Sequence, residues 1–523
     1  MRRALARLLL AFSVLLLLAA PLYHGLTRHY LANPDQDLDN SYIALRLVDD
    51  GTLTYFEHTG YPLSLLYAGA LKVAHAVGYV ESLDTAKLAA EPPETFDHAY
   101  ARLVYVGRVL TLLLALAALI QIWSLARQAT GNPLAAGCAA VLFGGSVGLG
   151  LQALQIRTEL LGTIFLLGSL QLTLVAARRA ASWQAAIALV AACGCAMLAV
   201  MTKYHFVLFV MTLPVVVWLY PPKRPAQRPA RRDVLLYLAT GTTLAAPATL
   251  HVLSIVSTHS TGTYQALLAG TVLALMLAYW RFHRLSPIWS ILGPASVLFG
   301  LAAGYSLIFL VPHDWTSRAV LTFREYSADF IGESTRTLSN NATWQQSLHT
   351  AVLATMARYL PPGMLIGRNT LAIVAWVCVA AALPLWYRGE RRAALLVGLP
   401  VLAAWVFEAT HYLHGYGFRG QYRVMVEFWL ILGFAHLIAL LDERPQLFAL
   451  PGKWVPAARA GVVLFCLAAS VVHVRLILLA PSSAYTRPPM NTCFWRHRTP
   501  MLVEQLERYC TTPPRLPGYP VSP

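Results

Sequence analysis

Charged side chains are scarce in this chain. Asp, Glu, Lys and Arg together make up 12% of its 523 residues, about half of the roughly 25% found in soluble domains. Apolar residues make up 57%, and they lie in blocks long enough to cross a bilayer, which takes about 20 residues as a helix. These features exclude an ordinary soluble protein. They predict an all-α polytopic membrane protein.

A clustered basic surface is also lacking, although Lys and Arg outnumber Asp and Glu by 40 to 24. Nucleic-acid binding needs a basic face or stripe, whereas here short basic tracts separate apolar blocks, as orientation signals do. We therefore expect membrane lipids as partners and no nucleic acid. The tracts include Arg2, Arg3 and Arg7; Arg178 and Arg179; Lys223, Arg224 and Arg228; and Arg388, Arg391 and Arg392.

Three further features are missing or few. No internal repeat is visible, which weakens the interpretation as a secondary transporter, because many transporters are built from repeats. No glycine-rich phosphate loop on a soluble domain is present, which disfavours a nucleotide-bound substrate. Five of the seven cysteines lie in apolar blocks and behave as small apolar residues. Cys493 and Cys510 share the C-terminal tail, where an oxidising compartment favours a disulfide over two free thiols.

The apolar blocks and basic tracts together predict thirteen spans. With the basic tracts on the cytoplasmic side, the alternation places the N-terminus inside and the C-terminus outside. We expect the first span to be retained, since Ala19-Ala20-Pro21 is a poor signal-peptide cleavage site. The spans lie near 8–26, 102–126, 134–152, 158–177, 183–202, 204–220, 234–256, 264–280, 287–311, 369–387, 393–412, 422–441 and 460–480.

This arrangement divides the chain into a transmembrane domain, residues 1–480, and a short outward tail, residues 481–523. Within the domain, 27–101 and 313–368 form the first and the large outward loops. The Ala, Leu and Arg richness suggests a bacterium, so the expected location is the inner membrane with both loops periplasmic. The large loop carries Arg358 and Tyr359 among several aromatic and basic residues, and is either a lid or an interfacial helix.

The first outward loop begins with an acidic run, Asp35-Gln36-Asp37-Leu38-Asp39-Asn40. A helix is expected to follow, capped by Asp39, Asn40 or Ser41 and closed by Gly51. A second helix should begin at Pro62 and end at Gly78, with its apolar residues on one face. Because it is too short to span, it is expected to lie amphipathically in the membrane interface.

The first loop resembles that of the GT-C glycosyltransferases, membrane enzymes that use polyprenyl-phosphate sugars. Within Asp39-Asn40-Ser41-Tyr42-Ile43-Ala44-Leu45-Arg46 and Thr59-Gly60-Tyr61-Pro62, the residues that match the arabinofuranosyltransferase-like pattern are Asp39, Ile43, Arg46, Gly60 and Tyr61. Asn40 replaces a second acid, and Thr59 replaces a Glu. Further matches are Gln155-Ile156-Arg157-Thr158-Glu159, Met201-Thr202-Lys203 and Arg419-Gly420-Gln421-Tyr422-Arg423. The resemblance covers residues 1–220, with isolated matches beyond.

The resemblance implies a GT-C fold and assigns to Asp39 the role of catalytic base or substrate-positioning group, of which we expect the base. It implies transfer of a sugar, with inversion, from a polyprenyl-phosphate donor to a hydroxyl of a cell-envelope glycan, lipid or protein. A positioned carboxylate base contributes roughly 10²–10⁴-fold to such a step. Asn40 stands against a scheme that needs two adjacent carboxylates to hold a metal, and the sequence does not require a divalent metal cofactor.

A leaving phosphate needs cationic donors, and several polar residues fall at the outward ends of the predicted spans. Each of them could instead mark the membrane interface by snorkelling. The predicted substrate-binding residues are Asn40, Arg46, Tyr61, Arg157, Glu159, Lys203, His205, His411, Arg419 and Tyr422. Two alternatives remain open. One is an enzyme like O-antigen ligases or polymerases, and the other is a secondary transporter.

Overall fold

The chain is described from a computed structural model, which covers residues 2–24, 26, 29–32, 37–51, 60–179, 182–210, 212–220, 230–243, 287–306, 344–360, 371–413, 422–479 and 499–511. The described part is 88% helical and holds no strand. It includes seven helices that are long and apolar enough to cross a membrane. The prediction of an all-α membrane protein is therefore confirmed.

The seven long helices all match predicted spans. They are α1 (Arg2–His24), α5 (Pro93–Thr130), α8 (Thr158–Arg178), α9 (Trp183–Thr202), α19 (Arg391–Leu413), α20 (Arg423–Glu443) and α21 (Val455–Leu479). Two shorter apolar helices, α14 (Pro287–Ser306) and α18 (Leu371–Tyr387), coincide with two further predicted spans. The span predicted at 264–280 lies outside the described residues, and the total of thirteen remains a prediction.

Two predicted spans are broken rather than continuous. The first consists of α6 (Pro133–Gly144) and α7 (Val147–Gln152). The break falls at Gly145, where an added Cβ would lie 2.5 Å from Ser470 Cβ on α21, and Ser146 then caps α7 by accepting from Leu149 N at 3.3 Å. The second consists of η3 (Tyr204–Phe206), α10 (Val207–Val210) and α11 (Leu213–Leu219). Pro214 has no N–H and sits in the first turn of α11.

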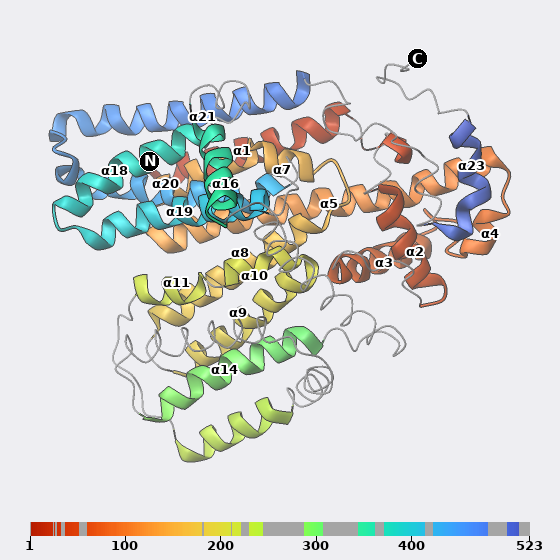
Figure 1. The fold of residues 1–523 in the computed structure, drawn as a ribbon, viewed down its shortest axis with the longest axis horizontal. Helices are drawn as coiled ribbons and strands as arrows, with labels where there is room; N and C mark the ends of the chain where they lie inside the picture. Colours follow the sequence, from red (N-terminus) through yellow and green to blue (C-terminus); the bar gives the residue numbers. More distant parts are fainter. Residues whose placement is uncertain are drawn as a thin grey trace.

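The long helices form one bundle. In Figure 1, α1, α5 and α18 to α21 run roughly side by side, and α8, α9 and α14 continue the bundle away from them. α20 lies at its centre and has 17 buried residues along 21 positions. Such a helix, apolar all round, belongs in the interior of a bundle. Five of the cysteines have free thiols, and they lie in α6, α9, α18 and α21.

Helix α5 is much longer than a span. Its 38 residues extend about 57 Å at 1.5 Å per residue, against about 30 Å for the hydrocarbon core. The apolar block predicted a start near residue 102, but the helix begins at Pro93. Its first turns therefore continue past the apolar part of the bundle. They carry Phe96 and Tyr100, which are fully buried under the first loop.

The first loop folds on this extension of α5 as α2 (Asp39–Asp49), α3 (Tyr61–Ala76) and α4 (Thr85–Ala89). Gly51 and Gly78 have positive φ, which confirms both predicted helix ends. The predicted capping of α2 is wrong, because Leu38 holds the N-cap position and no side chain caps the helix. Asp39 begins the helix instead, and the residues after it, Tyr42 to Leu45, are buried.

α3 has two apolar faces rather than one. Leu63, Tyr67, Leu71 and Ala74 pack inward, as predicted, together with α2 and α5. Leu66 was expected on the same face, but it is 41% exposed and lies with Val73 and Val77, which are more exposed still. An exposed apolar stripe on a helix too short to span is typical of one that lies in the membrane interface.

The C-terminal region packs on the first loop. Residues Pro500–Leu502 (η9) and Val503–Thr511 (α23) lie beside α2 and α4 in Figure 1. Leu502 and Leu506 are fully buried there, and Gln505 Nε2 donates to the Ala89 and Glu91 carbonyls at 2.9 and 2.7 Å. Part of the predicted tail is thus an integral piece of the first-loop subdomain. The predicted Cys493–Cys510 disulfide falls on side chains outside the described set.

The segments predicted to be cytoplasmic meet at one end of the bundle. Asp442 on α20 accepts from Arg2 Nη1 at 2.9 Å and from Asn132 Nδ2 at 2.7 Å, and it pairs with Arg459 on α21. Asn132 also caps α6 by accepting from Leu134 N at 2.9 Å. We call this the basic end. It ties together the starts of α1, α6 and α21 and the last turn of α20.

Candidate functional site

Asp39 lies in the first turn of α2 at the opposite end of the bundle. The residue is only 7% exposed, so it does not simply keep the loop soluble. A carboxylate in the first turn of a helix is favoured there by the helix dipole. Burial of an acidic side chain is costly without compensating partners. The structure therefore places the predicted base in a buried position, close to the residues described next.

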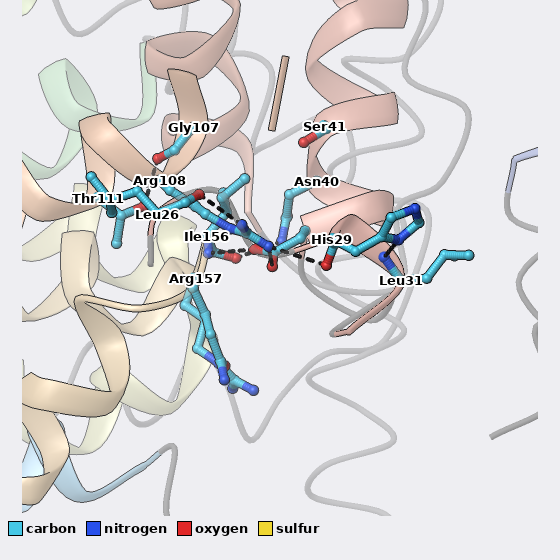
Figure 2. Close-up of polar contacts among 12 residues, drawn as sticks. Leu26, His29, Leu31, Asn40, Ser41, Gly107, Arg108, Thr111, Ile156 and Arg157 are labelled. Carbon is cyan, nitrogen blue, oxygen red and sulfur yellow. Dashed lines mark hydrogen bonds and ion pairs between the residues drawn. The ribbon is translucent and has the colours of Figure 1, made fainter. Parts of the chain in front are cut away.

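Asp37, two residues earlier, forms the most buried ion pair at this end. Its Oδ2 lies 2.7 Å from Arg108 Nη2, and both side chains are 2% exposed. Arg108 also donates from Nη1 to the Leu26 carbonyl at 2.8 Å. Figure 2 shows the Arg108 side chain reaching between Leu26 and His29. This pair fixes the start of α2 to α5 and to the segment after α1.

The start of α2 also forms hydrogen bonds with the short connection between α7 and α8. Asn40 Nδ2 donates to the Ile156 carbonyl at 2.9 Å, and Ile156 N donates to Asp37 Oδ1 at 3.2 Å. Ile156 is thus held through both of its backbone polar groups by residues on either side of Asp39. The sequence indicated that Asn40 and Arg157 belong to one site. In the structure Asn40 contacts Ile156, the residue that precedes Arg157.

Arg157, Glu159 and Lys203 form a buried charge cluster beyond this contact. Glu159 Oε1 lies 3.2 Å from Lys203 Nζ and 4.0 Å from Arg157 Nη1. Arg157 Nε donates to Gln155 Oε1 at 2.6 Å. Arg157, Glu159 and Lys203 are 8%, 2% and 6% exposed. In Figure 2 the Arg157 side chain extends away from Arg108 and Asn40.

Two cations therefore share one carboxylate, and the pairing is loose. Arg157 Nη1 is buried and makes no hydrogen bond, since its 4.0 Å separation from Glu159 is too long for one. A buried guanidinium nitrogen without a hydrogen bond is costly. Arg157 and Lys203 thus bring two positive charges to the Glu159 carboxylate at the start of α8. This arrangement suits an anionic ligand with oxygen acceptors.

Tyr422 and His205 complete the cluster. Lys203 Nζ lies 5.7 Å from the centre of the Tyr422 ring, a cation–π distance, and the His205 ring lies 5.5 Å from the same ring. Lys203 and His205 stand at the junction where α9 ends and the broken span begins. Residues 157, 159, 203, 205 and 422 were predicted as binding residues from separate parts of the sequence, and they meet here.

Other predicted residues lie elsewhere. Arg46 pairs with Asp50 one turn on and donates to Met501 Sδ, so it contacts the C-terminal segment rather than the charge cluster. Tyr61 is buried at the start of α3. Arg419 falls outside the described residues, as does the side chain of His411. For these last two residues the prediction is not tested.

Sequence reasoning missed several buried polar contacts. Neither Asp37 nor Arg108 was predicted to have a functional role. Their pairing joins positions 71 apart in sequence, and only the depth of Arg108 in an apolar block hinted at a buried partner. In the large outward loop, α16 (Trp344–Tyr359) docks on α19 through Arg358 and Tyr359, which both contact the fully buried Glu408.

Tyr67 links α3 to the helix that bears Asp39. Its hydroxyl donates to the Leu103 carbonyl at 2.7 Å and lies 2.7 Å from Ser41 Oγ. Burial raises the pKa of Tyr67 above its usual value, so the hydroxyl keeps its proton and donates. An added Cβ on Gly107 would lie 2.6 Å from the Tyr67 ring. Gly107 therefore allows α3, α5 and Ile156 to approach closely around α2.

Within the described ranges, no group of three His, Cys, Asp or Glu side chains is arranged to hold a metal ion. Comparison with models of known protein families gave no match, and no curated protein matches the chain. The fold and the site therefore define a broad class, an all-α membrane protein with a buried cationic cluster at one end of its helices. A narrower function has to be argued from that cluster.

Proposed function

We propose that the chain is an inverting glycosyltransferase that moves a sugar from a polyprenyl-phosphate donor to an acceptor hydroxyl at the periplasmic face of a bacterial inner membrane. The resemblance of its first loop to GT-C enzymes suggested this function. One structural observation supports it best: Asp37 and Asn40, which flank Asp39, both hydrogen-bond to the backbone of Ile156, the residue before Arg157. The proposed base and the proposed phosphate-binding cluster are thus linked through adjacent residues.

The proposed sidedness follows from the two ends of the bundle. The end with Asp442 carries the short basic segments, which the positive-inside rule assigns to the cytoplasm. The end with Asp39 and Lys203 is the opposite one, so it would face the periplasm. Nucleotide sugars are not expected there. A lipid-linked donor would reach a site at the ends of α8 and α9 from within the bilayer.

In the proposed reaction the acceptor oxygen attacks the anomeric carbon of the donor. The bond between that carbon and the phosphate oxygen breaks, and the phosphate leaves with the electron pair. The proton of the acceptor hydroxyl passes to the Asp39 carboxylate. Arg157 and Lys203 stabilise the negative charge that grows on the leaving phosphate, which is where fixed cationic donors contribute most.

Glu159 has a positioning role in this scheme. It lies 3.2 Å from Lys203 Nζ and holds that ammonium group at the end of α9. Arg157, which is more loosely associated with Glu159, remains able to turn its Nη1 toward a phosphate oxygen. Tyr422 and His205 form a wall beside Lys203 and suit contact with a sugar face or with the donor's first isoprene units.

The first experiment compares the wild type with Asp39→Asn. Purified protein is incubated with a panel of polyprenyl-phosphate pentoses and hexoses and a cell-envelope acceptor extract, and released polyprenyl phosphate is measured. Loss of the base is expected to lower turnover by about 10²–10⁴-fold. Asp84→Asn is the matched control. It makes the same chemical change in the same loop, and Asn caps α4 as well as Asp does.

Equal turnover by the wild type and Asp39→Asn would remove Asp39 as the base. If no polyprenyl-phosphate sugar in the panel is consumed by the wild type, the proposed function itself is wrong. A density map of the protein with a polyprenyl phosphate bound provides an independent check. The phosphate is expected within hydrogen-bond distance of Arg157 and Lys203.

A further inference from the structure

A second cationic cluster lies at the basic end, far along the bundle from Asp39. Its members are Arg178 at the end of α8, Tyr220 just after α11, Arg392 at the start of α19 and His436 within α20. Tyr220 and His436 are 8% and 6% exposed, and Arg178 is partly buried. Four segments thus contribute polar side chains to one cluster near the basic end.

The contacts within this cluster are directed and well formed. Arg178 Nη2 donates to the Ala129 carbonyl at 2.8 Å, and its guanidinium lies 5.1 Å from the centre of the Tyr220 ring. The Tyr220 hydroxyl lies 2.7 Å from His436 Nε2. Arg392 Nε donates to the Leu219 carbonyl at 3.1 Å. Neutral groups therefore orient both guanidinium groups.

Positive charge in this cluster is not balanced by acid. Among the described residues, neither Arg178 nor Arg392 forms an ion pair with a carboxylate. Asp442 at the same end shows the contrast, since it pairs with Arg2 and Arg459.

We propose that Arg178, Tyr220 and Arg392 bind the phosphate group of an anionic membrane lipid at the basic end. Lipid phosphates lie at the ends of spanning helices, and basic pockets between such helices bind anionic headgroups. Arginine presents several N–H donors in a planar fork that matches phosphate oxygens. Arg392 uses only its Nε within the described part of the chain, so its terminal nitrogens are available. The site is independent of the proposed glycosyltransferase activity.

The test measures lipid retention by native mass spectrometry after purification from nanodiscs that contain equal amounts of phosphatidylglycerol and phosphatidylcholine. The wild type is expected to retain one phosphatidylglycerol more than Arg392→Gln does. Removing one surface cation should weaken retention about fivefold, since each contributes about this factor near an anionic membrane. Arg392 is an exposed side chain, so this variant is expected to fold.

Arg391→Gln is the matched control. Arg391 is the preceding residue on α19 and has the same charge, but its guanidinium lies over the Trp386 ring, away from the cluster. It should retain phosphatidylglycerol as the wild type does. A second measurement uses only the wild type, whose melting temperature should rise with phosphatidylglycerol and stay unchanged with phosphatidylcholine, because a ligand that binds only the folded state stabilises it.

Three results would overturn the proposal. They are equal retention by the wild type and Arg392→Gln, an equal loss in Arg391→Gln, or no preference for phosphatidylglycerol over phosphatidylcholine. Release of the retained lipid by millimolar inorganic phosphate, with the same rise in melting temperature, would mean that the cluster binds free phosphate instead. That outcome also contradicts the lipid assignment.

Discussion

Two buried carboxylates lie on either side of Ile156, and they are paired in different ways. Asp37 has a guanidinium at 2.7 Å and a backbone N–H at 3.2 Å, and the guanidinium donates to a backbone carbonyl as well. Glu159 faces two cations, one at 3.2 Å and one at 4.0 Å. The first carboxylate is part of a compact, hydrogen-bonded network. The second lies between two cations, and the farther one is beyond hydrogen-bond distance.

This difference separates a structural role from a binding role. A buried ion pair at hydrogen-bond distance fixes the structure around it, and removal of one partner is very costly. Arg157 Nη1 is buried without a hydrogen bond, and an oxygen of an anionic ligand would supply one. We therefore assign Asp37 and Arg108 to folding, whereas under the proposed function Arg157 and Lys203 bind the ligand.

The largest expected effect on stability is that of Arg108→Ala. This change leaves the Asp37 carboxylate buried without its cation, which should lower the free energy of unfolding by about 3–5 kcal/mol. Arg102→Ala, six residues earlier on α5, breaks only the exposed pair with Glu81 and should cost less than about 1 kcal/mol. Denaturant titration of both variants in detergent measures the difference. Equal stability of the two variants would contradict the structural role of Arg108.

Lys203→Met is expected to lower turnover, and also stability, because Glu159 loses its nearer cation. It removes one donor to the leaving phosphate, which typically lowers kcat by about 10²–10³-fold, while Arg157 stays beside Glu159. Lys72→Met is its control, because Lys72 is an exposed residue of α3. The comparison uses the polyprenyl-phosphate release assay together with thermal unfolding. A loss of stability without a loss of kcat would assign Lys203 to the folding group instead.

A smaller effect is expected for Leu506→Ala, which tests whether the C-terminal segment supports the first loop. Leu506 is fully buried against the first-loop core, and such truncations cost about 2 kcal/mol or more. Faster proteolysis of the segment after residue 499 should accompany the loss. Glu504→Ala, an exposed change on the same helix, should leave proteolysis unaltered. If Leu506→Ala resists proteolysis as the wild type does, the docking is not stabilising.

The smallest effect is a pH dependence at His29, next to the Arg108 network. Burial lowers the pKa of His29 below 6.5, an effect that Asp97 opposes and Arg108 reinforces. The unfolded chain therefore takes up a proton near pH 6.5 and the folded one only at lower pH, so stability should fall as pH drops below about 6.5. His29→Gln should match the wild type at pH 7.5 and lose less stability at pH 5.5. Parallel curves for both proteins would exclude His29 as the source.

The long helices could be predicted because each depends on one continuous property, a run of apolar residues as long as a bilayer is thick. The two broken spans could not. At Gly145 the break depends on the close approach of Ser470, which lies 325 residues later in the chain. In the second case the predicted span end at 202 agrees with the end of α9 at Thr202, but the apolar run 204–220 gives no sign that it is divided into η3, α10 and α11. The hydropathy of the sequence shows neither break.

The charged residues likewise include some that the sequence identified and some that it did not. Lys203 and Glu159 could be chosen from their positions at span ends, and the structure places them 3.2 Å apart. The role of Asp37 was not predictable, because within the acidic run nothing distinguishes it from Asp35 or Asp39. Its burial depends on Arg108, 71 positions away. The docking of α23 on the first loop was missed for the same reason.

The sequence by itself determined that this chain is helical and belongs in a membrane, because apolar burial in lipid requires only local composition and length. It also determined where the glycine-ended helices of the first loop stop, since positive φ is a property of one residue. Only the tertiary structure decided which acid pairs with which base. Those pairings join residues that are distant in sequence. The Coulomb energy of two charges is large only when they lie within a few ångströms, and the fold determines which charges come that close.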